Sequence, residues 1–305
     1  MPMARAIVWS VARRFISMKC CTMKALLLYN VMSGRRTIVY RLGEIVEVFA
    51  RRDIVVHAKR IAFDKDPFEG EADVDLVVVC GGDGTVNYVV NAMRERGVDI
   101  PIGIIPTGTA NDLAGALRMP LDVVLAARKI AEGSERRVDC GDVNGVKFVN
   151  VLSFGVLTTT SQHTPDEAKR RFGKMAYLWV GMRDLVKMHP IRLKVTADGE
   201  SFESDVLMCL VFNGETAGRF RLARGARLDD GRLDVLLLER RNVMRACGSM
   251  IRYLLGGEPE AVRSFSAREL NIEALYDEPT DVDGQQGPHF PLAVKCEHRT
   301  LRVRC

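Results

Sequence analysis

The chain has 305 residues, of which 47% are hydrophobic and 27% are charged, and its formal net charge is +5. This length allows two domains, and the hydrophobic content is ordinary for a globular protein that buries a core. The mild basic excess fits an anionic substrate or an anionic membrane surface. Because the sequence lacks both an aromatic-interleaved basic platform and zinc-knuckle spacing, we expect no nucleic-acid partner. No apolar run reaches the roughly 18 residues that span a bilayer.

Residues 1–22 precede the fold pattern, which begins near Lys24, and we treat them as an N-terminal extension. They are basic and apolar, so they fit either an interfacial amphipathic helix or a disordered extension upstream of a start at Met23. The chain also has eight cysteines and no C-x-x-C pair. We expect reduced thiols of a cytoplasmic protein rather than a disulfide framework or a zinc site.

Strands and helices alternate over residues 23–133. We expect strands at 24–29, 53–57, 74–80 and 101–105, helices at 36–51 and up to about 96, and a short helix within 58–73. This alternation predicts a doubly wound α/β domain with a parallel sheet, in which ligands bind at the carboxyl ends of the strands.

The pattern changes from about residue 134. Alternating segments are joined by the turn pairs Asn144-Gly145, Asp198-Gly199 and Asp230-Gly231, which indicate hairpins. Residues 134–305 therefore predict an antiparallel β-rich domain, with strands at 137–142, 147–152, 191–196, 202–212 and 228–238 and helices at about 166–188 and 241–255. Near 281–287 the chain is expected to return to the first domain or to its cleft.

A glycine loop connects the strand at 74–80 to the next helix, and it consists of Gly81, Gly82, Asp83, Gly84, Thr85, Val86 and Asn87. Glycines allow a close approach of the backbone, and successive N–H groups at a helix start form a cradle for phosphates. Asp83 adds a carboxylate where Mg²⁺ could accompany a nucleotide. The loop matches neither the Walker A motif nor the dinucleotide fingerprint. The alternative is an ordinary glycine-rich turn.

Three further segments carry polar groups. In the loop 106–112, Thr109, Asn111 and Asp112 could contact a nucleotide or Mg²⁺, or could simply cap a helix. Residues 227–233 could bind a cation or form a turn. Within 281–287, a carboxylate could take a proton from an attacking hydroxyl, or the segment could again be a turn. The first of these loops and the glycine loop both follow strands, so they should face one crevice.

These motifs, in this order and spacing, resemble the diacylglycerol kinase and sphingosine kinase superfamily, and most of all its bacterial soluble lipid kinases. The matching segments are Gly-Gly-Asp-Gly-Thr-Val-Asn at 81–87, Pro-Thr-Gly-Thr-Ala-Asn-Asp at 106–112, Leu-Asp-Asp-Gly-Arg-Leu-Asp-Val at 228–235 and Asp-Val-Asp-Gly at 281–284. Residues 164–177 also resemble the family's mid-chain segment. The resemblance covers about residues 23–305.

The resemblance implies ATP-dependent phosphorylation of a lipid hydroxyl, with diacylglycerol as the expected acceptor. It implies an N-terminal α/β domain like those of phosphofructokinase and NAD kinase, a C-terminal β-sandwich, and an active site between them. ATP would be held by residues 81–87, by Thr109 and by the turn 30–34, where Asn30, Ser33 and Gly34 match the family's pattern and Val31 replaces its proline. A homodimer is a further expectation at the family level.

Two more roles follow from the resemblance. Asp230, with the carbonyls of Arg227 and Arg232, matches a structural Mg²⁺ site, and Asp283 falls on the family's catalytic aspartate. The family commonly has a glutamate, implicated as proton acceptor, where this chain has Gln285. Either Asp283 suffices as the base, or activity is reduced, or the role is lost. The alternatives are therefore an NAD kinase-like enzyme on a soluble substrate, and a weakened regulator that binds nucleotide or lipid.

A lipid acceptor requires contact with a membrane, so we expect a cytoplasmic protein that associates peripherally with anionic bilayers. Candidate docking residues are basic, and each could contribute about 1 kcal/mol near an anionic surface. They are Lys169, Arg170, Arg171 and Lys174 in one segment, and Arg219, Arg221, Arg224 and Arg227 in another. The alternative for both groups is an ordinary solvated surface.

Overall fold

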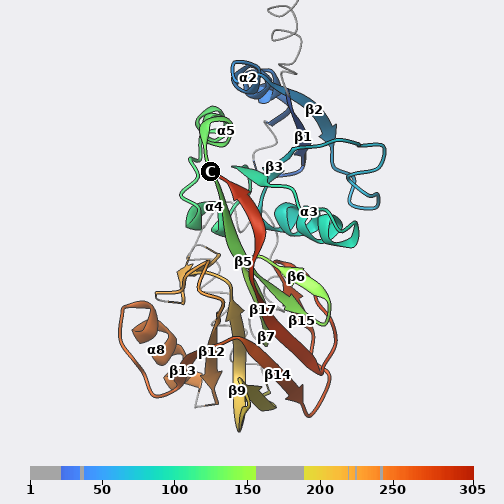
Figure 1. Ribbon diagram of the computed structural model, residues 1–305. Coiled ribbons are helices and arrows are strands. Elements are labelled where there is room, and N and C mark those ends of the chain that lie inside the picture. The colour runs from blue at the N-terminus through green and yellow to red at the C-terminus, as the bar shows by residue number, and fades with distance from the viewer. Residues whose placement is uncertain (1–21, 35–37, 156–188, 219, 224, 241–242) are drawn as a thin grey trace, which may run out of the picture.

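A computed structural model describes residues 22–34, 38–155, 189–218, 220–223, 225–240 and 243–305. It shows two domains, one above the other in Figure 1. The N-terminal domain contains β1 (Met23–Tyr29), α2 (Ile38–Ala50), β2 (Ile54–Arg60), β3 (Leu76–Gly81), α3 (Asp83–Glu95), β4 (Ile102–Pro106), α4 (Asp112–Ala116) and α5 (Val123–Glu132).

The C-terminal domain is built mainly of strands. Its elements are β5 (Glu135–Val143), β6 (Val146–Phe148), β7 (Val151–Gly155), β8 (Ile191–Ala197), β9 (Glu200–Phe212), β10 (Thr216–Ala217), β11 (Phe220–Arg221), β12 (Leu233–Glu239), α8 (Val243–Leu254), β13 (Val262–Ala267), β14 (Glu269–Ala274), β15 (Thr280–Val282), β16 (Gln285–Gln286) and β17 (Leu292–Arg304).

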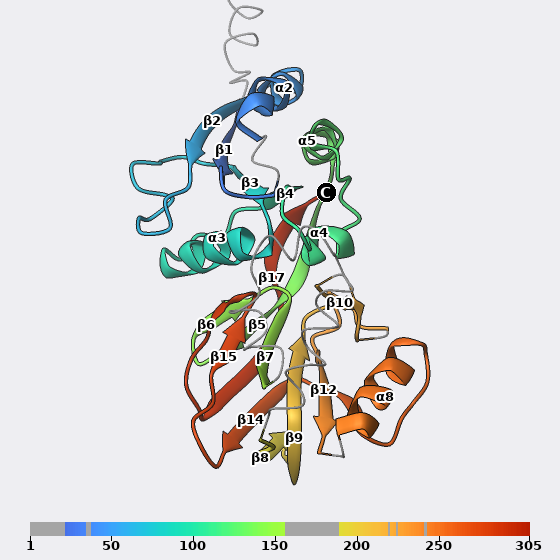
Figure 2. The same cartoon turned by 180° about the vertical axis from the view of Figure 1, so that it is seen from behind.

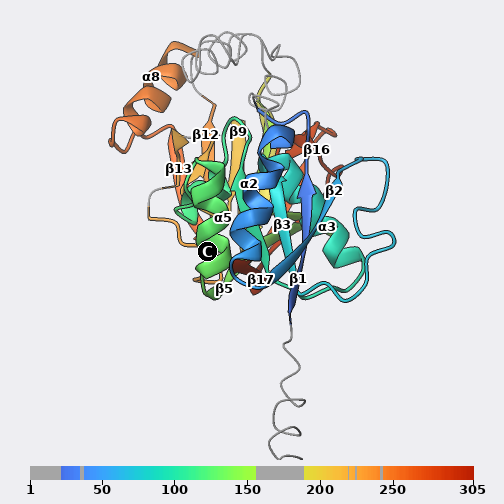
Figure 3. The ribbon, with the colours of Figure 1, turned by 90° about the horizontal axis from the view of Figure 1, so that it is seen from above.

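The N-terminal domain has the predicted doubly wound architecture. Its parallel strands lie in the order β2-β1-β3-β4. All six residues of β3 are buried, as expected for a central strand covered on both faces. Helices α2 and α5 pack side by side, and α3 lies on the other side of the sheet (Figure 3). The strand order reverses between β1 and β3, so the loops after these strands border the crevice where such folds bind ligands.

The C-terminal domain is antiparallel, as predicted. Along β8, buried and exposed residues alternate, because one face of the strand packs on the core. The hairpin between β5 and β6 turns at Asn144 and Gly145, both with positive φ (48° and 93°), which is the backbone of a type I′ turn. The turn at Asp198 and Gly199, between β8 and β9, has the same signature. Both hairpins were evident from the sequence.

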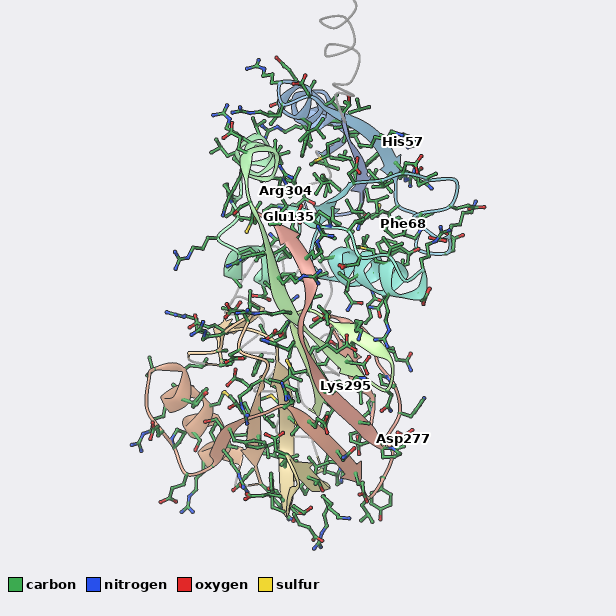
Figure 4. All side chains as sticks on the ribbon, viewed as in Figure 1. His57, Phe68, Glu135, Asp277, Lys295 and Arg304 are labelled. Atoms are coloured by element: carbon green, nitrogen blue, oxygen red, sulfur yellow. The ribbon has the colours of Figure 1, made fainter. Side chains whose placement is uncertain are left out.

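Two paired strands, β5 and β17, belong to both domains. β17 pairs antiparallel with β14 and β5, and near its end Val303 pairs parallel with Ile102 of β4. In Figure 4, Lys295 of β17 lies in the lower domain, whereas Arg304 lies beside Glu135 in the upper one. Apart from β10 and β11, which form a separate pair, the described strands of both domains therefore form one continuous sheet.

Three local predictions were wrong. The hairpin expected at Asp230-Gly231 does not form, because β12, which follows this turn, pairs with β9 and β13. Residues 61–75 contain turns instead of a helix, because Asp66 accepts a hydrogen bond from the Phe68 N–H and Gly70 has a φ of +77°. The strand expected at 147–152 is interrupted at 149–150, where the backbone N–H groups bind a side chain described below. The predicted helix at 166–188 lies outside the described residues, and α8 matches the helix expected at 241–255.

Candidate active site

Three loops meet at the carboxyl ends of β1, β3 and β4, and glycines make their contact possible. Gly34 has a φ of +53°, and a Cβ there would lie 1.9 Å from the Thr107 carbonyl oxygen. A Cβ on Gly108 would lie 2.4 Å from the Cα of Gly82. Since real Cβ atoms do not approach backbone so closely, the three loops can pack in this way only with glycine at these positions.

Hydrogen bonds join the same loops. The Asn30 side chain donates to the Thr85 hydroxyl at 3.1 Å. The Thr107 N–H donates to the Gly81 carbonyl at 3.0 Å, and the Thr107 hydroxyl donates to the Ser33 hydroxyl at 3.1 Å. The turn 30–34, the glycine loop and the loop 106–112 thus form one connected unit.

Asn111 closes the third loop. It adopts a left-handed backbone with a φ of 57°, a conformation that asparagine tolerates better than most residues. Its side chain accepts a hydrogen bond from the Gly108 N–H at 2.9 Å and donates one to the Gly108 carbonyl at 2.8 Å. Thr109 is exposed at the tip between them. The loop is therefore preshaped, with one threonine available to a ligand.

Asp83 lies in the first turn of α3 and ties the glycine loop to its surroundings. Its carboxylate accepts the Asn111 N–H at 2.7 Å and the side-chain amide of Asn150, from the C-terminal domain, at 3.1 Å. Burial raises the pKa of Asp83, and the negative charge of Asp112 raises it further. In the same turn the side chain of Val86 is buried in the core, so it supports the loop from below rather than facing a ligand.

Asp283 enters this site from the C-terminal domain. It is buried and has a left-handed backbone with a φ of 51°. One carboxylate oxygen accepts the N–H groups of Asn150 and Val151, at 3.0 and 2.8 Å. The other accepts the Val149 N–H at 2.7 Å and the Asn87 side-chain amide at 2.9 Å.

Two opposing influences act on the Asp283 carboxyl. Burial is the larger and raises its pKa to about 7, whereas the N–H donors from Val149, Val151 and Asn87 lower it. Because Oδ1 and Oδ2 accept two donors each, Asp283 organises the backbone at 149–151. This is why the predicted strand at 147–152 is interrupted.

Gln285 lies over the glycine loop. Its side-chain amide donates to the Gly84 carbonyl at 3.3 Å, and a Cβ on Gly84 would lie 3.7 Å from both the Asp283 carbonyl and the Gln285 amide nitrogen. Residues about 200 positions apart in the sequence are thus brought together. The structure thus places Gln285 beside the glycine loop, and its role in the reaction stays a prediction.

Several residues of this site were not foreseen. Asn150 contacts Asp83, and the Lys147 carbonyl accepts the side-chain amides of Asn87 and Asn91, at 2.7 and 3.0 Å. Asn91 in turn accepts the Lys147 N–H at 2.9 Å. A buried asparagine in a strand-like apolar run, as at Asn150, is the signal that could have revealed this contact, since buried amides need partners.

The turn at 227–233, which was predicted to bind a cation, is held by hydrogen bonds within the protein. Asp230 accepts the Arg232 N–H at 3.0 Å. Buried Asp139 accepts the Gly231 N–H at 2.7 Å. The Arg227 and Arg232 guanidinium groups bind carboxylates of Asp229 and Asp198, so only their carbonyls could face a cation.

Across the described parts of the chain, no group of three or more His, Cys, Asp and Glu side chains is placed to hold a metal ion. A site made of one carboxylate and two main-chain carbonyls suits a hard cation, so the Mg²⁺ site at Asp230 stays a prediction.

Comparison with known proteins assigns the family. Residues 24–143 match the diacylglycerol kinase catalytic domain, and residues 150–305 match the YegS C-terminal NAD kinase beta sandwich-like domain. A diacylglycerol kinase from Bacillus subtilis strain 168 is 34% identical over 277 residues, covering 88% of this chain and 91% of the relative. The chain belongs to the diacylglycerol kinase family. A diacylglycerol kinase from Staphylococcus carnosus strain TM300 is 31% identical, with 88% and 90% covered.

The fold of this lipid kinase agrees with that of a solved relative. A crystal structure of a diacylglycerol kinase from Bacillus anthracis strain Sterne superposes with a TM-score of 0.72 at 23% identity, covering 92% of this chain and 96% of that one. The β-sandwich resembles that of NAD kinases, but both family matches and the named relatives favour the lipid kinases. Among the helices that the structure describes, none is long and apolar enough to cross a bilayer.

Proposed function

We propose that the enzyme transfers the γ-phosphate of ATP to the hydroxyl of diacylglycerol in a Mg²⁺-dependent reaction. The observation that carries this proposal is the meeting of three glycine-containing loops beneath Asp283 and Gln285. The acceptor is inferred from the relatives, which are named diacylglycerol kinases and match along most of their length.

The three loops would bind ATP. No side-chain hydrogen bond caps the N-terminus of α3 at Gly82, so the N-terminal end of this helix is available to phosphates. Thr109 and the turn Asn30–Gly34 complete this binding surface. Mg²⁺ would supply charge neutralisation for the phosphates, with Asp83 and Asp112 as the candidate carboxylates, and Asp230 is the candidate carboxylate of a separate structural Mg²⁺ site.

Asp283 is the proposed proton acceptor. As the lipid hydroxyl bonds to the γ-phosphorus and ADP departs, the hydroxyl proton must leave, and a carboxyl with a pKa of about 7 is suited to accept it at neutral pH. Taking that proton requires the release of one N–H donor. The Asn87 amide is the simplest to release, because a side chain can rotate away whereas the backbone at 149–151 cannot.

The test uses purified protein beginning at Met23, γ-labelled ATP and Mg²⁺, with lipid acceptors in mixed anionic micelles. The panel holds diacylglycerol, monoacylglycerol, ceramide, a sphingoid base and a polyprenol, and NAD serves as a soluble acceptor. We expect label in diacylglycerol and its loss in Asp283→Asn. Asp277→Asn, a substitution on the exposed surface, is the matched control and should keep full activity.

The other outcomes separate the alternatives. Label in NAD without lipid would support an NAD kinase-like enzyme. Label in a different lipid would retain the mechanism and change the acceptor. No label from the wild type, but label from Gln285→Glu, would mean that the native chain is a binding protein or regulator. Docking on anionic membranes through Arg221 and Arg227 also remains a proposal, and residues 169–174 lie outside the described residues.

A further inference from the structure

A large cavity lies where the two domains meet, beside α4. It has a volume of about 1230 Å³, and its described walls come from α4 and the residues around it, from the start of β5, and from residues 214–216, 221 and 226–229. Figure 2 shows α4 directly above β10, which forms part of the opposite wall. Residues 81–87 do not line it, whereas Asn111 and Asp112 do. The cavity thus borders the catalytic cleft without containing the glycine loop.

The charge of its lining is strongly positive. Six arginines contribute to the walls, against three carboxylates, so the lining carries a net charge of 6 − 3 = +3. The arginines are Arg118, Arg136, Arg137, Arg221, Arg227 and Arg299, and the carboxylates are Asp112, Glu215 and Asp229. From the sequence alone, only Arg221 and Arg227 of these six arginines were placed in one basic group, because the other four come from distant segments.

Most of these arginines already have partners. Arg221 pairs with Glu215 at 2.6 Å, and Asp229 pairs with Arg227 at 3.2 Å and Arg299 at 3.9 Å. Arg137 pairs with Asp99 at 2.9 Å, outside the cavity.

Two arginines differ from these. Among the described residues, no carboxylate pairs with Arg118 or Arg136. Their two guanidinium groups can therefore bind an external anion.

The backbone of Arg118 is fixed at the end of α4. Its left-handed φ of 53° ends the helix, where the Arg118 N–H donates to the Gly115 carbonyl at 2.9 Å and the Met119 N–H to the Ala114 carbonyl at 2.8 Å. Lys129 donates to the Arg118 carbonyl at 3.0 Å. Apolar side chains complete the walls, among them Met119, Leu121 and Val138. The cavity therefore combines guanidinium groups with apolar surface.

We propose that this cavity is a second phosphate-binding site, in which Arg118 and Arg136 bind the phosphate of a ligand that does not occupy the glycine loop. Guanidinium groups form paired, charge-assisted hydrogen bonds with phosphate oxygens, which makes arginine well suited to the task. The phosphate can come from an anionic phospholipid headgroup or from a free phosphate compound. The proposal does not depend on which lipid is phosphorylated.

Calorimetric titrations can distinguish these sources. The lipid probe is dihexanoyl phosphatidylglycerol below its micelle concentration, a phosphodiester that is not a product of a diacylglycerol kinase. The free probe is inorganic phosphate. The variant Arg118→Gln/Arg136→Gln should weaken binding about tenfold or more, because two charge-assisted contacts are lost. The control variant Arg51→Gln/Arg192→Gln removes the same charge from exposed positions elsewhere and should bind like the wild type.

Each outcome bears on the site. If Arg118→Gln/Arg136→Gln weakens binding of the lipid probe alone, the site recognises a phospholipid headgroup. If it weakens binding of inorganic phosphate alone, the site recognises a free phosphate compound. If it weakens binding of both probes, the phosphate itself is the recognised group. Equal binding by the wild type and by Arg118→Gln/Arg136→Gln, or binding of neither probe, would overturn the proposal. The variant Arg118→Lys/Arg136→Lys keeps the charge and should retain part of the affinity, which separates lost recognition from misfolding.

Discussion

Single residues in this site serve two purposes at once. Asp283 organises the backbone at 149–151 and holds Asn87, yet burial raises its pKa to about 7. Its sequence context, Asp281-Val282-Asp283-Gly284, indicated a functional carboxylate by resemblance. The four donors could not be anticipated, because they come from residues that are remote in sequence and meet only in the folded chain.

The stability of the protein should depend on the protonation of Asp283. Its pKa in the fold lies near 7, above the value of about 3.9 in an unfolded chain, so the folded state binds the proton more tightly between these values. The contribution of this group to stability is thus largest at low pH and declines as pH rises toward 7. From pH 5 to 7, urea unfolding should show wild type losing about 2 kcal/mol relative to Asp283→Asn. Parallel pH curves for the two proteins would contradict this expectation.

Replacing Gln285 should change turnover. A glutamate there would lose the hydrogen bond to the Gly84 carbonyl but would place a second proton acceptor beside the glycine loop. We expect kcat to increase by up to about 100-fold in Gln285→Glu, the lower end of what general bases contribute. Gln286→Glu adds the same charge one residue away in β16 and should leave kcat unchanged. Equal rates for the two variants would show that position 285 has no catalytic importance.

At the scale of elements, the glycine loops can be predicted from the sequence because their conformation depends mainly on neighbouring residues. The strand, the glycines and the helix that follow one another at 76–95 fix the geometry at 81–84 almost alone. The same holds for the hairpin turns at Asn144 and Asp198. Sequence reading failed where a distant partner decides the backbone, as at 149–150, or where side-chain turns compete with a helix, as at Asp66.

The contact between loops gives a prediction for Gly108. In Gly108→Ala the new Cβ would lie 2.4 Å from the Cα of Gly82, so the loops must separate, at a cost of about 1–3 kcal/mol. We expect a large loss of ATP binding, measured by titration, and a lower unfolding midpoint. Gly43→Ala is the matched control, since nothing lies within 4 Å of its Cβ and alanine favours the middle of α2 by about 0.5–1 kcal/mol. Normal ATP binding by Gly108→Ala would refute the packing argument.

At the scale of the whole molecule, β17 determines how the domains are joined. Leu301 and Val303 are buried in the same core as the strands of the N-terminal domain, although they lie at the other end of the chain. Composition and periodicity divided the chain into consecutive domains near residue 133 and indicated a return to the first domain or its cleft near 281–287, but neither signal reports pairing between distant strands. The parallel pairing of Val303 with Ile102 is such a contact.

Removing the end of β17 should therefore damage the N-terminal domain, although the removed residues are far from that domain in sequence. Deletion of residues 300–305 removes Leu301 and Val303, leaving β4 unpaired on one side and opening the N-terminal core. Hydrogen exchange should then accelerate in β3 and β4, and kinase activity should fall severely. Cys305→Ser, which alters only the terminal side chain, should exchange like the wild type. Unchanged protection in β4 would show that the domain is complete without β17.

The position of β17 also sets an order of events during synthesis. The segment that completes the N-terminal domain is synthesised after the other strands of the β-rich domain, β5 to β16. The edge of the N-terminal sheet at β4 stays unpaired until Val303 has been synthesised, since strands that are far apart in sequence pair late. A partly translated chain can thus hold the glycine loop but not the finished cleft. We therefore expect phosphate transfer only after β17 has joined the N-terminal sheet.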